Sequence, residues 1–237
     1  MTQNTLTTKS RNDAPCLVVF CKRPALFHGK QRLAETIGAD KALSFARSFL
    51  DCALEDAQAW PGTVVLSPAS SADSAWAKTL LDRDCTIVAQ PLGGLGHRLW
   101  IVDRTLRRAG HHEILYIGTD APALTPSHYR EAAAALVTSD VVLRPAADGG
   151  VTMMGARTPW PDFRALPWGT SDLGQALAGL CRRQGLSIQS LVTSYDVDIE
   201  ADLDRLVVDL SNDRRPARQR LYRQLDAHVN QGADALA

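Results

Sequence analysis

The sequence predicts a three-layer α/β fold around one mostly parallel sheet, and two observations carry that prediction. Short apolar runs rich in β-branched residues alternate with longer segments of helical periodicity, which is the pattern of βαβ units. The 237 residues are 45% hydrophobic, enough for one large continuous core. We expect a flexible N-terminus over 1–14, a single α/β domain over 15–210, and an Arg-rich helical tail over 211–237.

The strands are predicted from short apolar runs bounded by loop residues. They are CLVVF from Cys16, TVVLS from Thr63, CTIVAQ from Cys85, EILYIGTD from Glu113, DVVLRPA from Asp140, VTMMGA from Val151 and SIQSLVTS from Ser187. The helices are predicted from apolar residues at helical spacing, and Trp60-Pro61-Gly62 is a typical stop. They cover about 39–58, 74–81, 97–109, 131–137 and 171–184, with a further start near residue 199.

Composition excludes several classes of protein. Lys plus Arg and Asp plus Glu both total 26, so we expect no nucleic-acid partner and no binding to an anionic membrane surface. No apolar run approaches the roughly 18 residues of a membrane span, and the polar first 14 residues have no signal-peptide core. Five cysteines without a CxxC pair indicate neither a disulfide framework nor a zinc site. A cytoplasmic protein is expected.

The loop after the first strand carries three cations, Lys22, Lys30 and Arg32, together with Pro24 and Gly29. In open α/β sheets ligands bind beyond the carboxyl ends of the strands. Cations there suit the neutralisation of a nucleotide's phosphates. A solvated basic loop explains the same residues about equally well.

The third strand leads into a glycine-rich loop, residues 90–96, which begins at Gln90 and contains Gly93. Such a loop lets the backbone approach a ligand closely, and Arg98 adds a side chain that suits a phosphate. The loop is neither a Walker A sequence nor a dinucleotide fingerprint, so by itself it is weak evidence.

Two acidic positions come directly after predicted strands. Asp120 closes EILYIGTD, and Asp198 belongs to the run Asp196-Val197-Asp198. Carboxylates at neighbouring strand ends can share one Mg²⁺ with substrate phosphates. The alternatives are a turn cap at Asp120 and a helix start at Asp198 or Ile199, with Asp202 in the first turn.

Asp148-Gly149-Gly150 combines a carboxylate with two flexible residues. It suits a tight hairpin turn or a wall against which an acceptor packs, and the turn is the favoured interpretation. The six histidines show no HxxxH or HxH spacing and no serine lies in a GxSxG elbow, which argues against zinc and triad hydrolases.

Six segments in order, FCKRPALFHGKQRL, QPLGGLGHRL, YIGTDAPAL, VVLRPAADGG, LPWGTS and DVDIEADL, resemble a bacterial family of proposed glycosyltransferases of the GT-A superfamily. The resemblance covers about residues 16–207 and implies a Rossmann-like nucleotide-diphospho-sugar transferase fold. More distantly, the chain is similar to molybdenum-cofactor and phospholactate guanylyltransferases and to sugar-acid cytidylyltransferases.

The resemblance implies Mg²⁺ or Mn²⁺ held by Asp120 and Asp198. The candidate catalytic residues are Lys30, Arg32 and Asp148. The candidate nucleotide-binding residues are Phe20, Lys22, Lys30, Arg32, Gln90, Gly93, Arg98, Gly149 and Gly150. The expected partners are a nucleotide-sugar or a nucleoside triphosphate and a small-molecule acceptor, and the tail is a candidate homodimer surface.

Several positions depart from the family pattern, among them Arg23 and Leu26 in the first loop, which replace alanine and proline, and Glu200-Ala201, which replace proline and glutamate. Phe27, Arg144 and Val151 stand where the family usually has glycine, glycine and an aromatic residue, and Ile199 replaces a threonine. These departures keep three alternatives open: a transferase using a nucleotide-sugar donor, which leads, a nucleotidyltransferase that releases pyrophosphate, and a degenerate protein that binds a nucleotide without turnover.

Overall fold

The computed structural model describes residues 14–234, with side chains described up to residue 230, and contains one seven-stranded sheet. The strand order is β3-β2-β1-β4-β6-β5-β7. All neighbours pair in parallel except β6, which is antiparallel to both β4 and β5. The strands are β1 (Cys16–Cys21), β2 (Val64–Pro68), β3 (Thr86–Ile87), β4 (Ile114–Ile117), β5 (Val141–Pro145), β6 (Val151–Ala156) and β7 (Ile188–Ser190).

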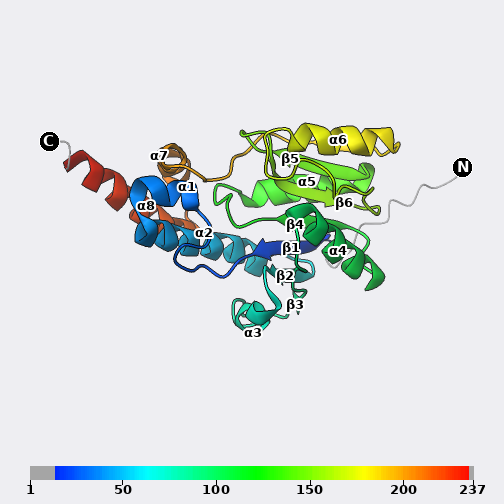
Figure 1. The fold of residues 1–237 in the computed structure, drawn as a ribbon, viewed down its shortest axis with the longest axis horizontal. Helices are drawn as coiled ribbons and strands as arrows, with labels where there is room; N and C mark the ends of the chain where they lie inside the picture. Colours follow the sequence, from blue (N-terminus) through cyan, green and yellow to red (C-terminus); the bar gives the residue numbers. More distant parts are fainter. Residues whose placement is uncertain (1–13, 235–237) are drawn as a thin grey trace, which may run out of the picture.

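Helices cover both faces of the sheet, so the predicted three-layer α/β fold is confirmed (Figure 1). The C-terminal half of α2 packs on one face with α5, and α4 and α6 pack on the other. A third cluster joins α1, the start of α2, α7 and α8. The helices are α1 (Gln31–Ile37), α2 (Ala39–Ala59), α3 (Ser74–Ala77), α4 (Leu95–Arg108), α5 (Pro126–Thr138), α6 (Leu173–Arg183), α7 (Glu200–Leu210) and α8 (Pro216–Asp234), with a short 3₁₀ turn, η1 (Ser71–Asp73).

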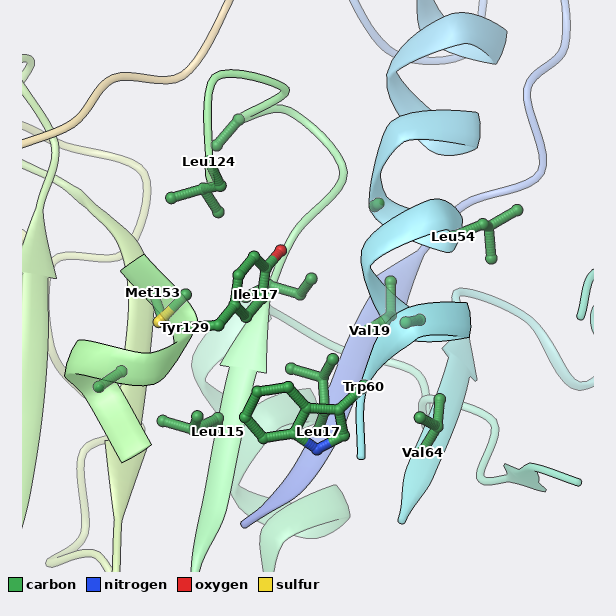
Figure 2. Packing of buried hydrophobic residues seen from close by; sticks show 14 of the residues in the cluster. Leu17, Val19, Leu54, Trp60, Val64, Leu115, Ile117, Leu124, Tyr129 and Met153 are labelled. Carbon is green, nitrogen blue, oxygen red and sulfur yellow. The ribbon is translucent and has the colours of Figure 1, made fainter. Parts of the chain in front are cut away.

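The face under α2 and α5 is sealed by two large aromatic side chains, Trp60 and Tyr129, whose ring centroids lie 6.0 Å apart (Figure 2). Leu17, Val19 and Leu115 lie beneath them on β1 and β4. Alternate residues of these strands face the other cluster, because side chains alternate across a sheet. Burial on both faces explains why β1 is continuously apolar rather than alternating.

Several predicted elements are shorter in the structure. The helix expected over 74–81 is the single turn α3, and the strands expected from Cys85 and Ser187 shrink to the two residues of β3 and the three of β7. Both strands lie at the edges of the sheet, where one neighbour is missing and pairing ends early.

The antiparallel direction of β6 results from the turn that precedes it. Asp148-Gly149-Gly150 turns the chain directly from β5 into β6, with Ala146 N–H donating to Gly150 O at 3.0 Å. Gly149 has a φ of +92°, a conformation that only glycine adopts without strain. A connection this short cannot cross over to a parallel strand, so the favoured interpretation of this segment as a hairpin turn is confirmed.

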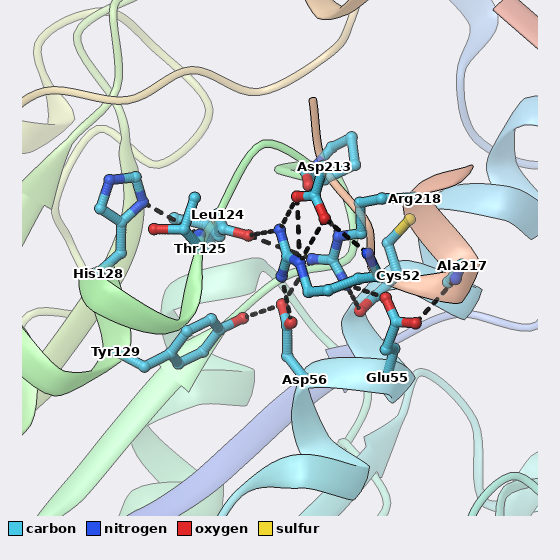
Figure 3. Close-up of polar contacts among 12 residues, drawn as sticks. Cys52, Glu55, Asp56, Leu124, Thr125, His128, Tyr129, Asp213, Ala217 and Arg218 are labelled. Carbon is cyan, nitrogen blue, oxygen red and sulfur yellow. Dashed lines mark hydrogen bonds and ion pairs between the residues drawn. The ribbon is translucent and has the colours of Figure 1, made fainter. Parts of the chain in front are cut away.

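Helix α8 has apolar residues in the core, and its charges do not all face solvent. Its residues Ala217, Leu221 and Leu225 are buried with α2 and α7. The side chain of Arg218 is 1% exposed and lies 2.6 Å from Asp56 (Figure 3). Arg215 pairs with the other oxygen of Asp56 at 2.7 Å. The helix thus packs as part of the core, while the predicted boundary at residue 210 stays a prediction.

Two further expectations concern the ends of the chain and the membrane. The flexible N-terminus was expected over 1–14, and residues 1–13 lie outside the described part. Between residues 14 and 234, no helix is long and apolar enough to cross a membrane.

Candidate functional site

Two acidic segments meet at the carboxyl edge of the sheet. Asp120 lies just after β4, and Asp196-Val197-Asp198 runs between β7 and α7. Val197 N–H donates to Asp120 O at 2.8 Å, which joins the two loops directly. The carboxyl edge of the sheet, where ligands bind in open α/β folds, therefore brings together residues that are distant in the sequence.

Lys30 connects the two predicted metal-binding carboxylates. Its Nζ lies 2.9 Å from Asp120 Oδ1 and 3.0 Å from Asp198 Oδ1, and it donates to Val197 O at 2.6 Å. The side chain is only 6% exposed. Burial by itself would lower the pKa of the Lys30 ammonium, but Asp120 and Asp198 outweigh it and hold this pKa above its ordinary value.

The loop reaches this position through two left-handed residues. Phe27 has a φ of 62° and Lys30 a φ of 51°, a region that costs a non-glycine residue roughly 1–2 kcal/mol. Lys30 precedes α1 as its N-cap and donates no side-chain cap to it. Its side chain instead makes contacts outside the loop, with Asp120, Asp198 and Val197 O.

Asp196 belongs to the site although the motifs in the sequence pointed only to Asp198 in this run. Burial raises the pKa of the Asp196 carboxyl to about 7, and the charges of Asp120, Asp148 and Asp198 add to the effect while Lys30 opposes it. The signal that could have found it is the alternation Asp-Val-Asp, which places two carboxylates on one side of an extended segment.

Asp198 and Asp202 have separate roles. Asp202 Oδ2 accepts from Asp198 N–H at 2.8 Å and from Ile199 N–H at 2.9 Å, so it caps α7, which begins after Ile199. The helix start considered for this run is therefore real, but Asp202 performs the capping. This leaves the Asp198 carboxylate directed at Lys30.

The donor atoms around Lys30 fit a hard divalent cation. Two carboxylates and one main-chain carbonyl surround the ammonium, and Mg²⁺ prefers oxygen ligands and is often held by one or two carboxylates plus substrate phosphates. Over residues 14–230, no three His, Cys, Asp or Glu side chains are placed to hold a metal on their own. The arrangement suits a metal that arrives with a nucleotide rather than a closed protein site.

A pocket opens beside the two carboxylates, between β4, β6, α4 and the start of α6, and has a volume of about 170 Å³. We call it the β4–β6 pocket. It is lined by Phe20, Leu95, Leu99, Tyr116, Ile117, Gly118, Asp120, Val151, Thr152, Met153, Met154, Trp168, Leu173 and Asp196. Of the predicted nucleotide-binding residues, Phe20 alone lines it, and its ring packs edge-on against Tyr116 at 6.1 Å.

The glycine-rich loop is held from within the chain. Gln90 Nε2 donates to Ser67 O at 2.7 Å, and Arg98 Nη1 donates to Gln90 Oε1 at 2.8 Å. Gly93 is exposed with a φ of +121°, so the turn requires a glycine. The polar groups of Gln90 thus already shape the loop, while Arg98 Nε has no partner in the described part of the protein.

The remaining predicted cations lie apart from Lys30. Lys22 is exposed, and Arg32 is exposed in the first turn of α1 rather than in the loop. Phe27 does not obstruct the site, because the residue is 79% exposed. Arg144 is buried and pairs with Glu131 of α5 at 2.7 Å. Its neighbour Leu143 packs with α4 and α6 on the opposite face of the sheet.

The Asp148 turn lies at the edge of the site. Asp148 is exposed and its Oδ1 accepts from Gly150 N–H at 3.0 Å. Gly149 O accepts from Gly174 N–H at 2.9 Å, so the two glycines pack against the start of α6. Their backbone is engaged within the protein, whereas the Asp148 charge acts on Asp196.

Comparison with known proteins shows that the chain shares its family with uncharacterized bacterial proteins and its fold with nucleotide-using transferases. Residues 50–170 match a family described as uncharacterized proteins conserved in bacteria (DUF2064). A proposed nucleotide-diphospho-sugar transferase from Desulfovibrio desulfuricans G20 is 25% identical with a TM-score of 0.82, over 92% of this chain and 97% of the other. No protein of curated function matches the chain.

Two further solved structures share the fold at lower identity. A 4-diphosphocytidyl-2C-methyl-D-erythritol synthase from Anaerococcus prevotii DSM 20548 is 10% identical with a TM-score of 0.53, over 81% of this chain and 95% of the other. A nucleotidyl transferase from Methanothermobacter is 16% identical with a TM-score of 0.50, over 88% and 99%. The resemblance stated from the motifs is thereby confirmed for family and fold.

Proposed function

The chain belongs to the DUF2064 family of bacterial proteins, and from this premise we propose that it is a transferase that takes its donor as a nucleotide complexed with Mg²⁺ or Mn²⁺. The observation that carries the proposal is the convergence of Asp120, Asp198 and Lys30 at the carboxyl edge of the sheet. The likeness to a proposed nucleotide-diphospho-sugar transferase supports a nucleotide-sugar as the donor.

Each residue has a part in this proposal. Asp120 and Asp198 hold the metal, which when bound neutralises the phosphate charge that develops on the leaving group. Lys30 leaves the carboxylates and pairs with the donor's phosphates, for which its ammonium is suited. Arg32, Lys22 and Arg98 add positive charge around the donor. Asp148 adds negative charge on the side of Asp196.

In glycosyl transfer, an acceptor oxygen forms a bond to the anomeric carbon of the sugar. The bond from that carbon to the diphosphate oxygen breaks, and the nucleoside diphosphate leaves with the electron pair. The proton of the acceptor passes to a base, for which a carboxylate at the edge of the site, Asp148 or Asp196, is available.

Nucleotidyl transfer is a second candidate because of the two residues next to Asp120 in the sequence. They are Ala121, which is buried, and Pro122, so the chain has no second carboxylate directly beside Asp120 to chelate a nucleotide-sugar. One structure of the same fold is also named a nucleotidyl transferase. In that reaction the acceptor oxygen attacks the α-phosphorus and pyrophosphate leaves.

A donor screen tests the proposal. The purified protein is heated with nucleoside triphosphates and nucleotide-sugars, each with Mg²⁺, with Mn²⁺ and with a chelator, and a ligand of the native state raises the melting temperature. We expect a shift that requires both nucleotide and metal and that disappears in Asp120→Asn. The matched control is Asp204→Asn, an exposed carboxylate of α7, which keeps the shift.

The product then separates the two reactions. Release of a nucleoside diphosphate from a nucleotide-sugar identifies glycosyl transfer, and release of pyrophosphate from a triphosphate identifies nucleotidyl transfer. A chain that responds to no nucleotide under any metal condition, while the wild-type fold is intact, contradicts the proposed function and favours the degenerate alternative.

A further inference from the structure

The walls of the β4–β6 pocket are mostly apolar. Aromatic rings from Phe20, Tyr116 and Trp168 face it together with aliphatic and thioether side chains. Trp168 reaches α4 because Gly96 leaves space for it, since a Cβ on Gly96 would lie 2.1 Å from Trp168 Nε1. Such a wall, with few polar groups, is the usual construction of a small-molecule site.

The polar groups of the walls are already hydrogen-bonded. Tyr116 O–H donates to Asp103 at 2.9 Å, Trp168 N–H donates to Phe163 O at 2.8 Å, and Thr152 O–H donates to Arg144 O at 3.3 Å. The carboxylate of Asp196 differs, because no described residue donates a hydrogen bond to it. A half-buried carboxylate without a donor from the protein can accept a hydrogen bond from a ligand in the cavity.

The charge of the lining has one sign. It contains Asp120 and Asp196 and no lysine, arginine or histidine. The cation beside it, Lys30, is not a lining residue and is engaged by Asp120, Asp198 and Val197 O. In the metal-free protein, a phosphate or carboxylate placed against Asp196 would meet a negative charge that no lining residue compensates, which disfavours binding.

We propose that the β4–β6 pocket binds the acceptor, and that the acceptor class is an apolar or aromatic body ending in a hydroxyl or amino group that donates to Asp196. Acceptors that place a phosphate or a carboxylate against Asp196 are disfavoured. The identification of the ligand as an acceptor rests on the proposed function. The preference for a hydroxyl or amino end rests on the pocket lining alone.

The test uses three probes with one body and different ends: phenethylamine, 2-phenylethanol and 2-phenylethyl phosphate. Their binding to the full chain is measured by ligand-observed NMR at alkaline pH with a chelator present. We expect the amine and the alcohol to bind at least about tenfold more tightly than the phosphate. In Asp196→Asn we expect the ratio of amine to phosphate affinity to fall by about tenfold, since the variant removes one of the two charges.

A second variant, Leu173→Trp, fills the pocket with a larger side chain, and Val137→Trp on the exposed side of α5 is its control. Leu173→Trp should abolish the competition between the amine and the alcohol for the pocket. Val137→Trp should leave this competition unchanged. Equal or tighter binding of the phosphate, or no binding of any probe, overturns the pocket assignment. An unchanged amine-to-phosphate ratio in Asp196→Asn overturns it as well.

The donor screen is run on the same samples, so the two proposals fail separately. A metal-dependent nucleotide shift without probe binding sinks the pocket assignment alone. The expected probe pattern without any nucleotide shift supports the pocket and sinks the proposed function.

Discussion

Lys30 Nζ lies 2.9 Å from Asp120 Oδ1 in a loop whose backbone is left-handed at Lys30 itself. The same ammonium lies 3.0 Å from Asp198, so one cation holds together two carboxylates that would otherwise repel each other. Lys30 therefore occupies the position that the proposed metal needs. Metal binding and displacement of Lys30 are then one event.

Lys30→Met is expected to strengthen the binding of Mn²⁺ alone by about tenfold, because the competing ammonium is gone. Without metal, the variant should be less stable by about 2 kcal/mol, since Asp120 and Asp198 lose their shared partner. Isothermal titration with MnCl₂ and chemical unfolding measure the two effects. Arg32→Met, which changes an exposed cation two residues away, should alter neither. Weaker binding of Mn²⁺ by Lys30→Met would show that the ammonium does not compete.

Asp196→Asn is expected to stabilise the protein at high pH. The folded pKa of Asp196 is raised to about 7, above the unfolded value of about 3.9, so ionisation costs folding free energy. This penalty is absent below about pH 4, grows as the pH rises toward 7 and is constant above it. With a chelator present, we expect Asp196→Asn to be about 2 kcal/mol more stable than the wild type at pH 8 and equal to it at low pH. A difference that does not change with pH would contradict the assignment, and Asp204→Asn serves as the control.

Arg218→Met is expected to cost about 3–5 kcal/mol of unfolding free energy, because it leaves the buried Asp56 with less compensation. Arg218 also donates to Pro122 O at 3.2 Å and to Leu124 O at 3.3 Å, in the segment after Asp120. The control is Arg220→Met, an exposed residue on the same helix, expected to stay within about 0.5 kcal/mol of the wild type. Urea unfolding measures both. If the two variants lose equal stability, the network in Figure 3 does not hold α8 in place.

Gly149→Ala and Gly169→Ala separate backbone strain from steric overlap. Both glycines have positive φ, +92° and +80°. A Cβ on Gly149 would lie 1.9 Å from Ser171 O, whereas a Cβ on Gly169 would meet nothing within 4 Å. We expect a loss of about 1 kcal/mol for Gly169→Ala and at least about 3 kcal/mol for Gly149→Ala. If thermal unfolding shows similar losses of stability for the two variants, the turn at Gly149 can move away from Ser171 at little cost.

Much of the fold could be predicted because local patterns decide it. The continuously apolar run from Cys16 to Phe20 predicts a strand buried on both faces, and β1 is such a strand. The pair Gly149-Gly150 predicts the turn that makes β6 antiparallel. The edge strands β3 and β7 could not be bounded, because the length of an edge strand depends on a neighbour that the sequence does not reveal.

The sequence by itself determined the family, the α/β architecture and the carboxyl-edge positions of Asp120 and Asp198, since strand periodicity and strand-end chemistry are local properties of the chain. Only the tertiary structure decided that Lys30 turns inward while Arg32 stays in solvent, that Asp196 lies in an apolar pocket, and that Arg218 is buried against Asp56. These outcomes depend on which loops and helices meet in space, and burial and pairing between distant residues fix the pKa and the partners of a charged side chain.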